Sequence, residues 1–464
     1  MDIRQKPVIV TSDFPKQVDW LHKDKINQFL LLCKPLDMKG VILLDPSLTR
    51  IFNNCDGISN IKNIAKLAGA SEGRVLEVIS ALWSAGFIQV EGKTAMATSE
   101  QVHPLPSLES WLHVTNDCNL ACSYCYVHKT KGLMTWETAQ RAINALTETA
   151  LLNHRSKILI KLAGGEPLLR FEFIKKVVDY GKKHGEKKGV EIRFHLITNG
   201  TLVSAESTSF IKANNLSVSI SLDGVGAYND QQRFYPNHRG SFASVDKGIK
   251  TLLAYGISPF VLATVTSLSL PGLPEFTHYL LDNGIGSRFS LYRDLVQGES
   301  LENINPETAI GTLNRCYDIF EEKLPERDLV NFHQLCDLKF VKKRKRNCGA
   351  GSSGIVIGHE GQVSICQALL DQPVGNIYSS DLIKVVRGQS QYSADENSVD
   401  DNPECRDCIW RYICAGGCPL LTKAEYGIFK KRSPYCNVFQ SCIPRLIRIM
   451  GLQMIKKMQS RSNG

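Results

Sequence analysis

The chain has 464 residues, of which 43% are hydrophobic, and a formal net charge of +9. That length is enough for two or three domains, each with its own hydrophobic core. No apolar run reaches the roughly 18 residues that a membrane-spanning helix needs, and the N-terminus lacks the hydrophobic stretch and cleavage site of a secretory signal. These features predict a cytoplasmic protein with no membrane segment.

The chain contains fifteen cysteines, and most of them fall in tight clusters. A reducing compartment keeps thiols free, so the clusters favour metal or redox chemistry over disulfides. Basic residues gather in runs at 182–188, 342–346 and 445–457. Such runs are usually solvated faces, nucleic acid is a second interpretation, and attraction of an acidic peptide partner is a third, which we prefer.

Residues 1–95 are expected to form a separate winged-helix-like domain. Two short strands precede three short helices whose apolar residues recur at helical spacing, and a third strand follows them. The strands are expected at 28–33, 40–44 and 86–90, and the helices at 46–54, 61–68 and 72–85. Asp45 is suited to cap the first helix, and Pro46 to its first turn. By fold alone this domain could bind DNA, recognise a peptide or act only as a structural cap.

Residues 96–107 form a linker to a second domain at 108–300, in which strands and helices alternate. The strands are expected near 111–115, 157–163, 191–198, 216–222, 258–265 and 287–293, and the helices near 134–152, 168–184, 204–214, 241–256 and 272–284. Strict alternation implies an α/β fold with a parallel sheet and helices outside it. Six units indicate a partial (β/α)6 TIM barrel whose reactive end lies at the carboxyl ends of the strands.

Three cysteines follow the first of these strands on one short loop, at Cys118, Cys122 and Cys125. Three thiolates can hold three irons of a cubane 4Fe-4S cluster whose usual complement is four cysteines, so one iron is left open. An open iron suits a reaction in which a small molecule is held and reduced at the cluster. The alternatives are three buried thiols or a zinc site, although zinc usually has a second ligand pair and no open position.

This loop and three later motifs together resemble the radical S-adenosylmethionine (SAM) enzymes. The motifs are Gly-Gly-Glu-Pro at 164–167, Thr-Asn-Gly at 198–200 and Ser-Leu-Asp-Gly at 221–224, and each follows an apolar run of strand length. Each motif is weak alone, but the combination is specific. The resemblance covers about residues 108–300 and implies that the three loop cysteines ligate a 4Fe-4S cluster to which SAM binds.

The resemblance also implies a set of SAM contacts. They are Tyr124, Gly164, Gly165, Glu166, Pro167, Thr198, Asn199, Ser221, Asp223 and Arg233. Tyr124 would lie beside the adenine, and residues 164–167 would present backbone to the methionyl amino group. Ser221 and Asp223 would contact the ribose, and Arg233 would face the methionyl carboxylate. A plain strand-ending turn is the alternative for Ser221 and Asp223.

Two helical regions flank a third domain at 346–442. Residues 301–345 are expected to form a helical connector, with helices near 305–323 and 328–343. Residues 443–464 are expected to form a C-terminal helix.

The third domain carries seven clustered cysteines: Cys348, Cys366, Cys405, Cys408, Cys414, Cys418 and Cys436. A zinc ribbon would explain four thiols but not seven. The spacing resembles the SPASM extension of the radical SAM enzymes, which holds two auxiliary 4Fe-4S clusters, and a hairpin is expected at 355–365. The resemblance implies one cluster on Cys405, Cys408, Cys414 and Cys436, and three ligands to the other from Cys348, Cys366 and Cys418. Cys316, Cys336 and Cys442 are candidates for the missing ligand, and a site left open for substrate is the alternative.

The reaction that the resemblance implies is reductive cleavage of SAM to a 5′-deoxyadenosyl radical, which removes a hydrogen atom from a substrate carbon. A reductant such as flavodoxin or ferredoxin would supply the electron, and the auxiliary clusters would accept an electron from the substrate radical or bind a substrate thiolate. The first step demands no general base, so no catalytic side chain is assigned. In the related sulfatase maturases an aspartate directly after the second cysteine of the extension is the base; here Gln367 stands at that position, and an amide cannot take the proton.

The N-terminal domain resembles the PqqD-like peptide-recognition domain of maturases that act on ribosomally made peptides, in which the precursor's leader pairs as an extra strand at the sheet edge. Together with Gln367, this resemblance favours a maturase that binds a ribosomally synthesised precursor peptide and installs a thioether or C–C cross-link. Sulfatase- or quinoprotein-type maturation is the runner-up, and oxidative excision is a further possibility. A DNA-binding iron–sulfur sensor would not need the SAM motifs, so a nucleic-acid partner is not expected.

Overall fold

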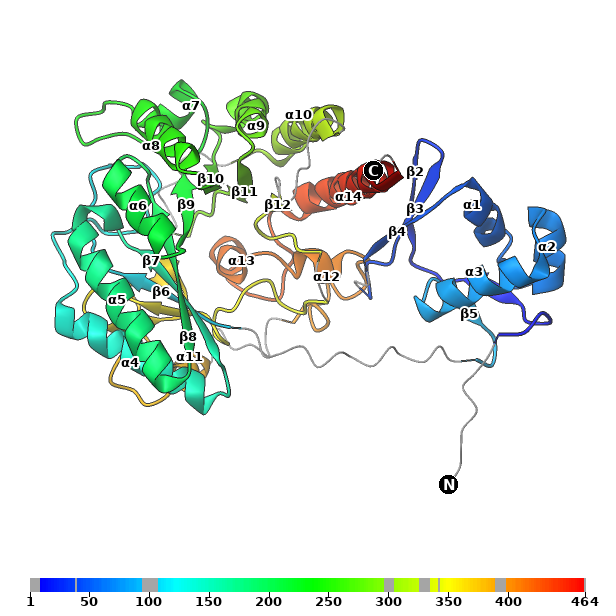
Figure 1. The fold of residues 1–464 in the computed structure, drawn as a ribbon, viewed down its shortest axis with the longest axis horizontal. Helices are drawn as coiled ribbons and strands as arrows, with labels where there is room; N and C mark the ends of the chain where they lie inside the picture. The colour runs from blue at the N-terminus through cyan, green and yellow to red at the C-terminus, as the bar shows by residue number, and fades with distance from the viewer. Residues whose placement is uncertain are drawn as a thin grey trace.

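The computed structural model describes residues 9–37, 40–93, 107–295, 304–324, 334–340, 343–388 and 398–462. An N-terminal α/β unit and a barrel-like sheet lie at opposite ends of the molecule, and helix α14 (Cys436–Ser462) runs between them (Figure 1). The described strands form sheets of two, three and ten strands. No described helix combines the length and the apolarity needed to cross a membrane. The linker expected at 96–107 falls outside the described residues except for residue 107.

The N-terminal unit contains the three helices and the closing strand that its sequence predicts. Its strands are β1 (Pro15–Gln17), β2 (His22–Ile26), β3 (Phe29–Cys33), β4 (Val41–Leu44) and β5 (Ile88–Val90), and its helices are α1 (Pro46–Asn53), α2 (Ile61–Ala68) and α3 (Glu72–Ser84). The Asp45 carboxylate caps α1 by accepting a hydrogen bond from the Leu48 N–H at 2.8 Å. In the three-stranded sheet β3 is central, so β2 and β4 form the two edges.

The second domain is the partial parallel barrel that the alternating pattern predicts. Its strands are β6 (Leu108–His113), β7 (Lys157–Ala163), β8 (Glu191–Thr198), β9 (Ser217–Ser221), β10 (Phe260–Val265) and β11 (Gly286–Leu291). The intervening helices are α4 (Trp136–Leu152), α5 (Phe171–Lys188), α6 (Ala205–Ala213), α7 (Ala227–Asp230), α8 (Phe242–Ala254) and α9 (Leu273–Asp282). The six strands pair in parallel and in chain order, so their carboxyl ends meet at one rim.

Later segments of the chain extend this sheet at both edges. β12 (Gln334–Leu335) pairs in parallel with β11, and β13 (Ile355–Ile357) pairs in parallel with β6. β13 continues into the expected hairpin with β14 (Gln362–Ser364), followed by β15 (Gly375–Asn376). Shorter helices follow in the third domain at α11 (Leu382–Gly388), α12 (Arg411–Cys414) and α13 (Pro419–Tyr426).

The prediction of a helix at 328–343 is wrong for the described residues 334–340. They form β12 and a turn, because Leu335 is drawn into the core beside β11. The other predicted helix of this connector is present as α10 (Pro306–Lys323).

Helix α14 joins the N-terminal unit to the rest of the molecule. On one side it packs on α10, and on the other it packs on β2, β3 and β4. Arg448 of α14 pairs with Asp24 at 2.9 Å and with Glu321 at 3.1 Å. Gly451 permits a close approach to the sheet, since a Cβ atom there would lie 2.3 Å from the Leu31 Cδ1.

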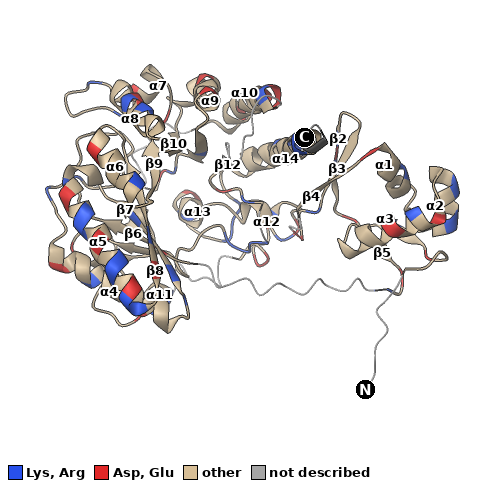
Figure 2. Ribbon diagram, in the orientation of Figure 1, with Lys and Arg blue, Asp and Glu red and all other residues tan. Residues whose placement is uncertain are grey.

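Lysine and arginine residues are frequent on the outer helices of the barrel, above all on α5 (Figure 2). The run at 182–188 is the carboxyl-terminal end of α5, and most of its lysines are exposed to solvent. Arg445, in the last basic run, instead pairs with Asp318 at 2.7 Å and with Glu321 at 2.9 Å. The run at 182–188 is therefore largely a solvated face, and Arg445 belongs to an intramolecular ion-pair network.

Candidate functional site

The three loop cysteines lie close together at the carboxyl end of β6. Burial raises the pKa of the Cys118 thiol to about 11, and the nearby Glu166 carboxylate and Cys122 thiolate act in the same direction. Burial also raises the pKa of Cys122, and the Cys125 thiolate adds to that shift. Cys118 Sγ accepts hydrogen bonds from the Leu120 N–H at 3.4 Å and from the Asn199 amide at 3.8 Å. The loop thus gathers three sulfur atoms, and a bound cation would offset the burial that disfavours the thiolates of Cys118 and Cys122.

The two glycines at 164 and 165 fasten the loop after β7 to the cysteine loop. A Cβ atom on Gly164 would lie 2.3 Å from the Thr115 carbonyl oxygen, and one on Gly165 would lie 2.1 Å from that of Asp117. The Gly165 N–H donates to the Thr115 carbonyl and the Glu166 N–H to the Asp117 carbonyl, both at 2.8 Å. Glycine is required here because two backbones touch.

Glu166 is fully buried, and its carboxylate is hydrogen-bonded to other groups of the protein. Its carboxylate accepts hydrogen bonds from the Leu168 N–H at 2.9 Å, the Thr198 hydroxyl at 2.7 Å and the Asn199 N–H at 2.7 Å. The Asn199 amide also donates to the Asn119 side chain at 2.8 Å. Glu166 therefore ties the ends of β7 and β8 to the cysteine loop.

Asp223 is the centre of a second buried network. Its carboxylate accepts hydrogen bonds from the Tyr124 hydroxyl, from Gln232 at 2.7 Å and from the Thr264 N–H at 2.8 Å. Arg233 donates to the Tyr124 oxygen and lies 3.6 Å from the Asp223 carboxylate. The Arg233 Nε is buried without a hydrogen-bond partner among the described residues.

A cavity of about 440 Å³ opens in front of these networks. Seven of the ten predicted SAM contacts line it, together with the three loop cysteines; the seven are Tyr124, Gly164, Gly165, Thr198, Asn199, Ser221 and Arg233. Glu166, Pro167 and Asp223 do not line the cavity, because they are buried behind its wall. These three residues position the wall rather than form it.

The cavity wall also includes residues that the motifs do not indicate: Trp111, Lys129, Arg288, Ser290, Tyr292, Arg293, Cys336 and Gln367. Three of them, Arg288, Ser290 and Tyr292, alternate along β11 and its carboxyl end. Alternate residues of a strand face the same side. This spacing is the signal by which the sequence could have revealed them.

The seven cysteines of the third domain fall into two groups. Burial raises the pKa of Cys405 to about 12, and then Cys436 and Cys408 act in the same direction. Burial also raises the pKa of Cys414, and the Cys405, Cys408 and Cys436 thiolates act in the same direction. Burial raises the pKa of Cys366 and of Cys418, and here the Cys348 thiolate acts in the same direction. The grouping matches the partition that the SPASM resemblance implies.

A local backbone feature separates Cys414 from Cys418. The three residues between them, Ala415, Gly416 and Gly417, all have positive φ, at 47°, 80° and 73°. This left-handed run reverses the chain, so two cysteines four positions apart face different groups.

The three candidates for a missing ligand differ in their surroundings. Cys316 and Cys442 are fully buried in α10 and α14, in the hydrophobic core. Cys336 lines the cavity, and its sulfur accepts a hydrogen bond from Arg293 at 2.9 Å. Arg293 also lowers the pKa of Cys366 and Cys418, against the effect of burial. Of the three candidates, Cys336 therefore lies nearest the group of Cys348.

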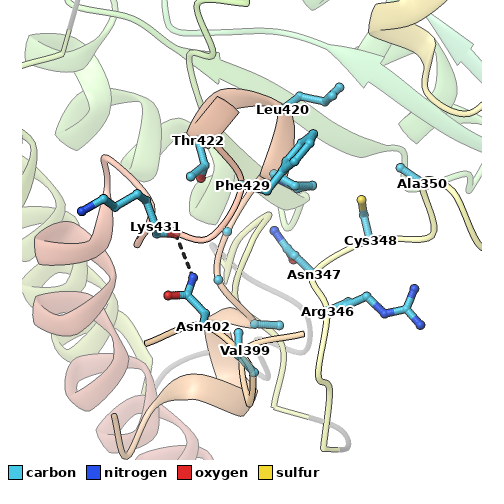
Figure 3. Close-up of a pocket in the computed structure, with 14 residues that line it drawn as sticks. Arg346, Asn347, Cys348, Ala350, Val399, Asn402, Leu420, Thr422, Phe429 and Lys431 are labelled. Atoms are coloured by element: carbon cyan, nitrogen blue, oxygen red, sulfur yellow. Dashed lines mark hydrogen bonds between the residues drawn. The ribbon is translucent and has the colours of Figure 1, made fainter. Parts of the chain in front are cut away.

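A smaller pocket, of about 40 Å³, lies beside that group. Figure 3 shows Cys348 and Arg346 on one of its walls, with Asn402 donating a hydrogen bond to the Lys431 carbonyl at 3.0 Å on the other. Within the described ranges, no three His, Cys, Asp or Glu side chains converge closely enough to hold a single metal ion. A cubane cluster places one iron before each thiolate and so spaces its ligands more widely than a single ion does.

Comparisons with known proteins agree with this arrangement. The model of the Radical SAM superfamily matches residues 112–278, and that of the iron–sulfur cluster-binding domain SPASM matches residues 348–409. An uncharacterized protein of Methanocaldococcus jannaschii is 32% identical over 285 residues, which are 60% of this chain and 92% of that protein.

Two solved structures share the fold. Native anSMEcpe with bound AdoMet and Cp18Cys peptide has a TM-score of 0.62 at 23% identity, covering 74% of this chain and 99% of its own. Streptococcus suis SuiB bound to precursor peptide SuiA has a TM-score of 0.54 at 15% identity, covering 91% of this chain and 99% of its own. The matches and the cavity together identify the chain as a member of the radical SAM superfamily of enzymes that carries a SPASM iron–sulfur domain.

Proposed function

We propose that this enzyme removes a hydrogen atom from a ribosomally synthesised precursor peptide and installs a thioether or C–C cross-link. One observation carries the proposal. The cavity is lined both by the three loop cysteines and by Gln367 and Ala368, which directly follow Cys366 of the third domain in the chain. A peptide radical formed in this cavity would lie against an auxiliary cluster, which is where an electron must leave if a new bond is to form.

The cysteine groups are the proposed ligand sets. The loop cysteines would hold the SAM-binding 4Fe-4S cluster, and the two groups of the third domain would hold two auxiliary 4Fe-4S clusters, with Cys336 or a substrate thiolate completing the second. When bound, the first cluster and SAM supply a hydrogen-abstracting radical. Flavodoxin or ferredoxin is the proposed reductant.

The chain's own residues have definable tasks toward the cofactor. The Arg233 Nε, buried and unpartnered among the described residues, is available to the methionyl carboxylate. The N–H groups of residues 165 and 166 already donate hydrogen bonds to backbone carbonyls of the protein. The methionyl ammonium group of SAM would therefore bind to carbonyl oxygens of this segment. The Leu120 and Asn199 N–H groups stabilise negative charge on Cys118.

Residues 1–95 are proposed to recognise the leader of the precursor. SuiB, whose fold covers most of this chain, was solved with its precursor peptide. Strand β4 is apolar and, in the part of the chain that the structure describes, pairs only with β3. An apolar edge strand offers main-chain hydrogen bonds to an added strand.

Sulfatase-type maturation is the second candidate, because the anSMEcpe fold has the higher TM-score of the two. Residue 367 separates the two candidates. It lines the cavity but carries an amide, which cannot act as a general base for oxidation of a cysteine or serine to formylglycine.

The test combines cofactor cleavage with mass spectrometry of the product. The enzyme, reconstituted without oxygen and reduced with dithionite, is expected to release 5′-deoxyadenosine, and replacing Cys118, Cys122 and Cys125 with Ala should abolish this release. A short precursor encoded beside the gene and co-expressed with the enzyme should lose two hydrogens. Release by the triple variant would refute the assignment of the reactive loop. A formylglycine product would favour the second candidate, and a larger mass loss would indicate excision.

A further inference from the structure

The active cavity is lined by four cations, Lys129, Arg233, Arg288 and Arg293, and by no carboxylate among the described residues. Three of the four already have polar partners. Arg233 pairs with Asp223 at 3.6 Å and Arg293 with Asp337 at 3.0 Å. The Lys129 ammonium donates to the Leu120 carbonyl at 2.7 Å, beside the cysteine loop. Among the described residues, Arg288 is the one of the four cations for which neither an ion pair nor a hydrogen bond of its guanidinium is found.

Arg288 is placed where a substrate would lie. Ser221 on β9 pairs with Leu262 on β10, and Leu262 pairs with Arg288 on β11. Two strand spacings therefore separate Arg288 from Ser221, a distance of about 10 Å. Both residues line the cavity, so a molecule bound beside Ser221 would share the cavity with Arg288.

The Arg288 side chain is exposed to the cavity and lies over the Phe260 ring, 5.8 Å from its centroid. Across the described ranges it has no carboxylate within ion-pair distance. An arginine fixed on a strand, stacked on an aromatic ring and lacking a counter-ion is prepared to bind a planar anion through two parallel hydrogen bonds.

A second cation reinforces the positive charge at this position. Lys339, which follows β12, has a lowered pKa, first through burial and then through the nearby Arg344 and Arg288 guanidinium groups. The largest effect that raises the pKa of Lys339 comes from Glu109, which already pairs with Lys161 at 2.6 Å. A carboxylate bound by Arg288 would offset part of the repulsion that lowers the pKa of Lys339.

We infer that Arg288, supported by Lys339, binds the side-chain carboxylate of an Asp or Glu residue of the substrate peptide, near the residue from which hydrogen is removed. This inference rests on the proposed function and adds a substrate class to it. The acidic residue would hold the peptide in the cavity at a fixed distance from the cofactor. It would also exclude segments with a basic residue at that position.

The test measures peptide selection without turnover. The reconstituted holoenzyme with SAM and no reductant is incubated with a random octapeptide library that is acetylated and amidated at its ends, so that only side chains carry carboxylates. Captured peptides are sequenced by mass spectrometry at 0.15 M salt. Wild-type enzyme should enrich Asp- or Glu-containing peptides about tenfold, the effect of one charge-assisted contact.

Three variants make the assignment specific. Arg288→Met should remove the enrichment, and Arg288→Glu should invert it in favour of Lys- or Arg-containing peptides. Arg193→Met is the matched control, because Arg193 is a strand arginine outside the cavity that pairs with Glu191; it should select as the wild type does. The inference is overturned if the wild type shows no acidic preference, if Arg288→Glu retains it, or if Arg193→Met loses it equally. A wild-type enzyme that releases no 5′-deoxyadenosine would instead refute the proposed function.

Discussion

Two histidines in the barrel resist protonation in the folded protein. His113, at the end of β6, is fully buried, and neither ring nitrogen has a hydrogen-bond partner among the described residues. Burial lowers its pKa to about 4, and the nearby His359 acts in the same direction. His195 on β8 also has its pKa lowered to about 4, by burial and then by Lys161.

These histidines should make the protein less stable in mild acid. Unfolded histidines titrate near 6.5, so between about pH 6.5 and pH 4 the unfolded state binds protons that the native state does not. The free energy of unfolding should therefore decrease as the pH is lowered through this range, by up to about 1.4 kcal/mol per pH unit for each histidine. Anaerobic urea titrations at several pH values measure this slope. His113→Phe should reduce this slope by up to about 1.4 kcal/mol per pH unit, whereas replacement of the exposed His278 with Gln should leave it unchanged. An unchanged slope in His113→Phe would show that His113 accepts a proton in the native state.

At the scale of single residues, the sequence motifs predict which residues surround the proposed SAM site, but not which of their side chains face the cavity. Gly164 and Asp223 stand at strand ends, which the sequence shows, yet whether a side chain faces the cavity or its supporting wall depends on long-range partners. Asp223 turns away because Gln232 and the Thr264 N–H take its oxygens. Thr264 is 41 residues away along the chain, and local sequence carries no signal for that contact.

The contact of α14 with the N-terminal sheet depends on one glycine. A Cβ atom at Gly451 would lie 2.3 Å from Leu31 and 2.7 Å from Ile26, both fully buried. Gly451→Ala should therefore push the helix off the sheet and lower the stability by about 1–3 kcal/mol, as overpacking does. Gly311→Ala in α10 is the matched control, because no atom lies within 4 Å of its Cβ position; it should raise the stability by about 0.5–1 kcal/mol. Urea midpoints measure both, and equal shifts would contradict the packing argument.

Elements with a strong local pattern are predicted well, and elements formed by pairing are not. Strands β7 and β8 coincide with their predicted bounds, because their apolar runs are flanked by caps and glycines. β2 has the polar sequence His-Lys-Asp-Lys-Ile and shows no local strand signal, yet it pairs with β3 over five residues. The two-residue β12 likewise exists only through its pairing with β11. The partner of β2 follows it after a two-residue turn, so its polar residues rather than distance hide the strand, whereas β12 and β11 lie more than forty residues apart along the chain.

At the scale of the whole molecule, the N-terminal unit is seated on the third domain. The His22 ring meets the Trp410 ring edge-on, with centroids 5.4 Å apart. Leu36 packs on a small buried cluster that includes Cys405 and Tyr412. The segment bearing one proposed auxiliary ligand set is therefore also part of the platform for the proposed leader-binding domain, and deleting that domain would uncover apolar surface on this segment and on α14.

Loss of that auxiliary cluster should therefore loosen the N-terminal unit, whereas loss of the SAM-binding cluster should not. Cys408→Ala removes a proposed ligand that is not part of the Leu36 contact, so it acts through the cluster rather than through lost packing. Hydrogen exchange of the β2 and β3 amides should become about tenfold faster in this variant, equivalent to about 1.4 kcal/mol of local stability. Cys118→Ala is the control, because its loop belongs to the barrel at the other end of the molecule (Figure 1). Equal exchange rates of the β2 and β3 amides in the two variants would mean that the contact between the N-terminal unit and the third domain does not depend on the auxiliary cluster. Faster exchange in Cys408→Ala alone would mean that the stability of the N-terminal sheet depends on an intact auxiliary cluster.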